Sequence, residues 1–97
     1  MNVPGEDAAR EAVARLEALA EDLEARGFAA RLVDVGGYAA VRVAHRVVSQ
    51  LSETIYAASA GDGMWWFWWS WADPIVPVSE VETAAFKIAY VLTPSGR

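Results

Sequence analysis

The 97-residue sequence contains no cysteine and a single histidine. Without cysteine the chain forms no disulfide and offers no thiolate to a metal ion, as is usual for proteins of the reducing cytoplasm. A zinc site built from histidines needs more than one imidazole, and the sequence offers only that of His45. We therefore predict a cytoplasmic protein that has neither a metal ion nor another cofactor.

Long hydrophobic runs are also missing. The longest run of large apolar side chains covers residues 64–69, whereas a membrane-spanning helix needs roughly 20 residues. Residues 1–7 are acidic and contain neither the basic nor the apolar region of a signal peptide. We expect a single domain over 1–97 that makes no membrane contact and has flexible ends at 1–5 and 93–97.

Positive charge is scarce, because 13 acidic residues outnumber 8 basic ones and give a net charge of −5. Binding to a phosphate backbone depends on basic groups that displace counterions. The charge balance therefore argues against direct binding of nucleic acid and leaves proteins or small molecules as the expected partners.

Two amphipathic segments stand at the ends of the chain. The first, about 6–26, repeats apolar residues at steps of three and four and ends at Gly27, a residue that favours a helix C-cap. The second follows Ser79 and Glu82, whose spacing predicts a capping box. Its apolar face is expected to consist of Val81, Ala85, Ile88 and Leu92.

Between the helices the hydrophobic period changes to two, which predicts strands at about 29–35, 38–43, 54–60 and 65–71. Gly36-Gly37 and Asp62-Gly63 stand where two-residue hairpin turns need positive φ. Two prolines predict an extended link over 73–77. The order αββββα predicts an α+β two-layer sandwich, in which a four-stranded antiparallel meander carries both helices on one face and leaves the other open.

The segment Trp65–Trp71, of sequence WWFWWSW, is the most informative one for a binding surface. Successive side chains of a strand point to opposite faces, so Trp66 and Trp68 share one face of the sheet. A two-residue turn at Asp62-Gly63 places Trp68 opposite Ala57, which belongs beside the helices. We therefore expect Trp66 and Trp68 in the core.

The open face is expected to hold the remaining aromatic side chains of this strand, which point away from the helices. Counting outward from Gly36-Gly37 pairs Leu32 with Val41 and Arg31 with Arg42, and arginines suit a solvated face. The side chains predicted on the open face, and predicted to contact a partner, are Arg31, Tyr38, Arg42, Tyr56, Phe67, Trp69 and Trp71.

Several large aromatic rings on an uncovered face exceed what a soluble monomer usually exposes. A homodimer through this face, a different partner protein, or a segment of the same chain folded over it would each explain the pattern. A small ligand that stacks on tryptophan is a further alternative.

Catalytic chemistry finds little support in the sequence. His45 is the one candidate general base, and the neighbouring Ser49, Ser52 and Glu53 form no recognisable triad. Gly36-Gly37 lacks the lysine and the following helix of a phosphate-binding loop. We therefore expect a protein that is not an enzyme.

The segments Gln50–Thr54 and Trp66–Ile75 resemble those of short, uncharacterised actinobacterial proteins. In that family a leading acidic helix, a WFWWSW-like strand and a trailing helix recur, and the resemblance covers the chain from the first helix to about Leu92. The family has no known function, so the resemblance implies no site residue. By analogy alone, small proteins of this kind resemble accessory partners of transcription regulators.

These observations together predict a non-catalytic protein-interaction module. It is expected to self-associate or to dock a partner through the aromatic open face, with small-molecule binding by aromatic stacking as the alternative.

Overall fold

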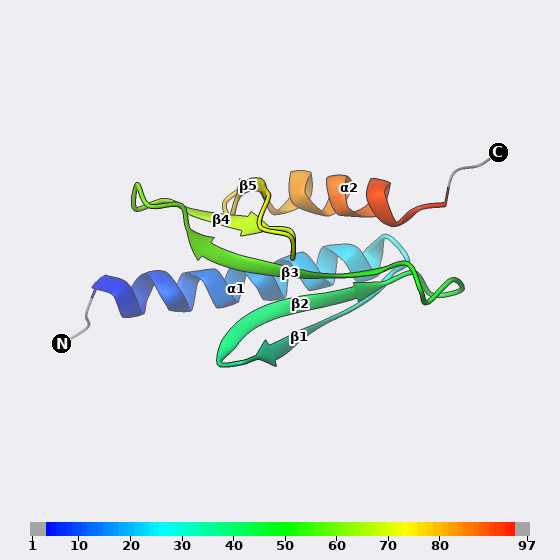
Figure 1. Ribbon diagram of the computed structural model, residues 1–97, viewed down its shortest axis with the longest axis horizontal. Helices are drawn as coiled ribbons and strands as arrows, with labels where there is room; N and C mark the ends of the chain where they lie inside the picture. Colours follow the sequence, from blue (N-terminus) through cyan, green and yellow to red (C-terminus); the bar gives the residue numbers. More distant parts are fainter. Residues whose placement is uncertain (1–3, 95–97) are drawn as a thin grey trace.

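The computed structural model describes residues 4–94, and the predictions made for 1–3 and 95–97 lie outside the described residues. The elements are α1 (Pro4–Ala25), β1 (Ala29–Val35), β2 (Tyr38–Ala44), β3 (Ser52–Ser59), β4 (Trp65–Trp68), β5 (Pro74–Pro77) and α2 (Val81–Leu92) (Figure 1). The α+β fold is confirmed. The antiparallel sheet has five strands in the order β1-β2-β3-β4-β5, one more than predicted.

The sequence of helix α1 combines an apolar stripe along one side with acid-base pairs four residues apart on the other. Leu16, Leu19 and Leu23 are buried, while Arg26 pairs with Asp22 at 2.7 Å on the more exposed side. The helix ends in a Schellman arrangement, because the amide of Phe28 donates to the carbonyl of Leu23 and Gly27 adopts a φ of 98°. This end of the helix directs the chain into β1.

The first hairpin has the predicted register. Val35 pairs with Tyr38 across the two-residue turn Gly36-Gly37, and both glycines have positive φ. The same register places Arg31 opposite Arg42. In the next pair of strands Val41 lies opposite Ile55, and both are fully buried.

The hairpin between β3 and β4 corrects the prediction for the tryptophan strand. Its loop contains three residues, Gly61–Gly63, and is closed by a hydrogen bond of 2.9 Å from the Ala60 amide to the Met64 carbonyl. The extra residue shifts the register by one, so Phe67 rather than Trp68 lies opposite Ala57. A shift of one residue turns every side chain of a strand to the other face.

The placement of the aromatic side chains is therefore inverted. Phe67 has an exposed fraction of 0% and lies in the core, where Trp65 and Trp69 pack against the buried cluster. Trp66 and Trp68 lie on the opposite face of the sheet. The predictions that Trp66 and Trp68 are core residues and that Phe67 and Trp69 lie on the open face are wrong.

The segment predicted as an extended link forms a fifth strand. Pro74–Pro77 pairs with β4 through Trp66↔Pro77 and Trp68↔Pro74, with an irregular register. Proline is tolerated here because β5 is an edge strand. The predicted capping box is also wrong, since α2 begins after Glu80 and has no side-chain cap hydrogen bond, which leaves Ser79 outside the helix.

Both helices bury their apolar stripes in one core. Helix α1 contacts β1, β2 and β3, while α2 lies beside α1 and contacts β5 (Figure 1). Helix α2 contributes Ala84, Ala85, Ile88 and Leu92, so the predicted face is largely confirmed. Neither helix of the described chain is long and apolar enough to cross a membrane.

Candidate functional site

The face of the sheet opposite the helices, here called the open sheet face, is defined by alternation with the buried residues Val41, Val43, Ile55 and Phe67. Its main side chains are Arg31, Val33 and Val35 of β1, Tyr38, Ala40 and Arg42 of β2, Thr54, Tyr56 and Ala58 of β3, and Trp66 and Trp68 of β4.

Two guanidinium groups supply all the charge that the strands place on this face. Arg31 and Arg42 are direct partners in the register and both are exposed. The acidic strand residues, Asp34 and Glu53, alternate to the helix side. The open sheet face is thus positively charged although the chain carries a net charge of −5.

Neither arginine of this pair has a carboxylate partner among the described side chains, those of residues 7–94. Arg31 and Arg42 line a groove at the β1 edge of the sheet, and Glu24 of α1 lines the same groove. Its Oε2 atom accepts a hydrogen bond from the Ala30 amide at 3.3 Å and lies 4.0 Å from Arg46, so this carboxylate is directed elsewhere.

Aromatic rings cover the middle of the open sheet face. Ala40 has an exposed fraction of 0% without any helix above it, and its neighbours in the register are Val33 and Tyr56. The Nε1 atom of Trp68 donates to the carbonyl of Ala58 at 3.1 Å, so this indole reaches across to β3. Tyr38, by contrast, is 72% exposed. The result is an apolar platform beside two free cations.

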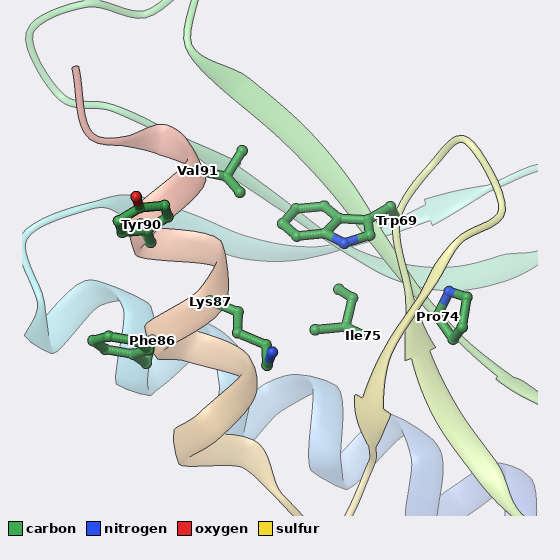
Figure 2. Close-up of a pocket in the computed structure, with 7 residues that line it drawn as sticks. All are labelled: Trp69, Pro74, Ile75, Phe86, Lys87, Tyr90 and Val91. Atoms are coloured by element: carbon green, nitrogen blue, oxygen red, sulfur yellow. The ribbon is translucent and has the colours of Figure 1, made fainter. Parts of the chain in front are cut away.

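A second surface lies on the helix side, between α2 and β5. This groove, here called the α2 groove, has a volume of about 430 Å³ (Figure 2). It is lined by Trp69, Pro74, Ile75, Phe86, Lys87, Tyr90 and Val91. The indole of Trp69 stacks on that of Trp71, with ring centroids 4.9 Å apart and an interplanar angle of 6°.

The structure separates the seven side chains predicted to contact a partner. Arg31, Tyr38, Arg42 and Tyr56 lie together on the open sheet face. Phe67 is buried, Trp69 lies on the helix side, and Trp71 is 51% exposed in the turn after β4.

Sequence reasoning missed the indoles of Trp66 and Trp68 on the open sheet face. It also missed the outer side of α2, where Phe86 is 61% and Tyr90 78% exposed. The sequence did carry a signal for this side of α2. Phe86 and Tyr90 are four residues apart and lie outside the stripe of Ala85 and Ile88, so they form a second apolar face of the helix.

The imidazole of His45 has a local structural contact. Its Nδ1 atom accepts hydrogen bonds from the amides of Val47 and Val48 at 3.1 and 3.0 Å, which shapes the loop between β2 and β3. Within residues 7–94, whose side chains the structure describes, no three histidine or acidic side chains are grouped so that they could hold a metal ion.

Comparisons with models of protein families, with curated proteins and with solved structures find no match for this chain. The resemblance to short actinobacterial proteins therefore stays a prediction, and a functional proposal depends on the two surfaces alone.

Proposed function

We propose that the chain is a non-catalytic protein-interaction module that docks a partner protein through the open sheet face. The observation that carries the proposal is the arginine pair, Arg31 and Arg42, which stands without a carboxylate partner beside exposed and half-buried aromatic rings. The absence of cysteine favours a cytoplasmic location for this activity.

The chemistry of the face defines the partner. Like charges directly opposite each other destabilise a pair of strands, and carboxylates from outside would relieve this repulsion. Arginine binds a carboxylate through two parallel hydrogen bonds, and arginine, tyrosine and tryptophan dominate binding at protein interfaces. The expected partner surface therefore carries Asp or Glu next to apolar side chains.

A second copy of the chain fits this face less well. Sheet-to-sheet packing about a twofold axis that passes near the arginine pair would bring four guanidinium groups together, because each copy contributes Arg31 and Arg42. The strands supply no carboxylate on that side to neutralise them. An acidic partner protein is therefore favoured over the homodimer.

Single-stranded nucleic acid also stacks on aromatic rings of open sheets. Its affinity depends on several phosphate contacts by basic residues, whereas this face supplies two arginines on a chain of net charge −5. The charge balance thus favours a protein.

A random peptide library displayed on phage provides a defined test. Selection against the wild-type chain is expected to enrich peptides that combine acidic and apolar residues, and Arg42→Glu is expected to weaken the binding of the selected peptides by about 30-fold or more, as for an interface hot spot. Arg15→Glu is the matched control, because it makes the same charge change on α1, where Arg15 contacts Glu11.

Four results would contradict the proposal. Selected peptides without acidic residues, or equal binding to Arg42→Glu and wild type, would exclude the arginine pair as the recognition element. Tighter binding of an oligothymidine than of the peptides would indicate nucleic acid. A dimer in light scattering that Tyr38→Ala dissociates would identify a second copy as the occupant.

A further inference from the structure

We infer that the α2 groove is a binding site for a small molecule with an aromatic or branched apolar body and a single carboxylate. The groove lies on the helix side of the sheet, so this inference does not depend on the function proposed for the open sheet face. Its volume of about 430 Å³ falls within the range of roughly 300–1,000 Å³ that is typical of small-ligand pockets.

The apolar part of the site is built around one fixed indole. In Figure 2 the ring of Trp69 extends toward α2 between Val91 and Ile75. Trp71 stacks on Trp69, and the Nε1 atom of Trp71 donates to the carboxylate of Asp73 at 2.8 Å. Because one face of Trp69 is held by this stack, the ring offers a fixed apolar surface to a ligand.

The turn that builds this stack is strained. Residues 70–72 form a loop closed by a hydrogen bond of 2.9 Å from the Trp69 amide to the Asp73 carbonyl. Ala72 in this loop has a φ of 72°, and it is the one non-glycine residue with positive φ among the described residues. Strained backbone of this kind concentrates at binding and catalytic sites, which agrees with a functional role for the neighbouring groove.

The charged part of the site is Lys87, the only lysine of the chain. Figure 2 shows its side chain reaching from α2 toward Ile75. The residues three and four positions away on the helix are Thr83, Ala84, Tyr90 and Val91, and none of them carries a carboxylate. Asp73, which precedes the lining residue Pro74 in the chain, accepts a hydrogen bond from Trp71. Among the described side chains of residues 7–94, no carboxylate forms an ion pair with Lys87. An unpaired ammonium group beside an apolar groove favours an anionic ligand.

The same lining sets the charge and polarity of that ligand. A phosphate group usually requires several donors, such as arginine forks or a lysine together with backbone amides, whereas the side chains of the groove lining supply one ammonium group. A sugar would need several converging polar groups, whereas the remaining lining is apolar apart from the hydroxyl of Tyr90 and the indole Nε1–H of Trp69. A monocarboxylate with an apolar body matches both features.

Titration by two-dimensional NMR, following the Nε1–H resonances of the tryptophans, tests the inference. The probes are phenylacetate, indole-3-acetate and hexanoate, with phenylacetamide as the uncharged match of phenylacetate. At least one carboxylate is expected to bind saturably below about 5 mM, where 1 mM corresponds to about −4.1 kcal/mol, and to shift the Trp69 resonance.

Variants of Lys87 then test the contribution of its charge to binding separately from that of the apolar lining. Lys87→Met keeps the apolar stem and is expected to weaken carboxylate binding by about tenfold, as for the loss of a charged hydrogen bond, while phenylacetamide is unaffected. Lys87→Arg is expected to retain binding. Arg42→Ala, on the open sheet face, is expected to leave the carboxylate affinity unchanged.

The opposite results would overturn the assignment. Absence of saturable binding for all three carboxylates would exclude the site. Equal affinity of wild type and Lys87→Met would exclude the lysine as the anion contact. Loss of binding in Arg42→Ala would transfer the anion site to the open sheet face and leave the groove unassigned.

Discussion

Replacing Phe67 by alanine tests the register that the structure gives to β4. Phe67 is fully buried and pairs with Ala57 above the helices. Truncation of a buried phenylalanine to alanine usually costs about 3–5 kcal/mol, because it removes buried apolar surface and leaves a cavity. The expected loss is a large part of the roughly 5–15 kcal/mol that stabilises a typical domain.

The measurement is unfolding by urea and by heat, followed by circular dichroism. A loss of about 3 kcal/mol corresponds to a fall in Tm of about 12 °C or more in a domain of this size. Tyr38→Ala is the matched control, since it also removes an aromatic ring but from a position that is 72% exposed. Its free energy of unfolding is expected to change by less than about 0.5 kcal/mol.

The same pair of variants distinguishes the two registers. With a two-residue turn at Asp62-Gly63, Phe67 would lie on the open face, and its removal would leave the fold nearly as stable as Tyr38→Ala. A loss below about 1 kcal/mol for Phe67→Ala would therefore refute the three-residue loop and return Trp66 and Trp68 to the core.

Two further predictions concern positive φ. Ala72→Gly is expected to stabilise the fold by about 0.5–1 kcal/mol. The left-handed conformation costs an alanine about 1–2 kcal/mol, and the greater freedom of glycine in the unfolded chain offsets part of the gain. No gain in the free energy of urea unfolding would contradict strain at Ala72. Gly63→Ala is expected to destabilise it by a similar amount, since Gly63 has a φ of 86° and an added Cβ meets no atom within 4 Å. Unchanged stability there would mean that the loop adopts another turn.

The first hairpin could be predicted in detail because its turn has one solution. Gly36-Gly37 supplies two adjacent residues with positive φ, and the alternation of Val41, Arg42 and Val43 separates a buried from a solvated face. Turn chemistry and hydrophobic pattern therefore agree on a single register, which places Arg31 opposite Arg42. This part of the candidate site was accessible from the sequence.

The second hairpin could not be predicted, because its glycines permit two turns. Asp62-Gly63 can form a two-residue turn, because aspartate tolerates the positive φ that this turn requires, and Gly61–Gly63 can form a three-residue loop in which only the two glycines have positive φ. The hydrophobic pattern of β4 does not choose between them, since both of its faces consist of aromatic residues. In the structure Asp62 Oδ1 accepts from the Met64 amide at 2.9 Å, an additional bond that supports the longer loop.

The assignment of the open sheet face therefore depends on β1 and β2 more than on the tryptophans. The arginines identify the solvated side, and the pairing of Val41 with Ile55 transmits that assignment to β3. The pairing of Ala57 with Phe67 then extends the assignment to β4, although the aromatic sequence of β4 does not itself distinguish its two faces. The partner contact is also attributed to the arginine pair. The correction in β4 therefore changes which aromatic rings share the open sheet face with that pair, Trp66 and Trp68 in place of Phe67 and Trp69. It leaves the charged element of the proposed interface in place.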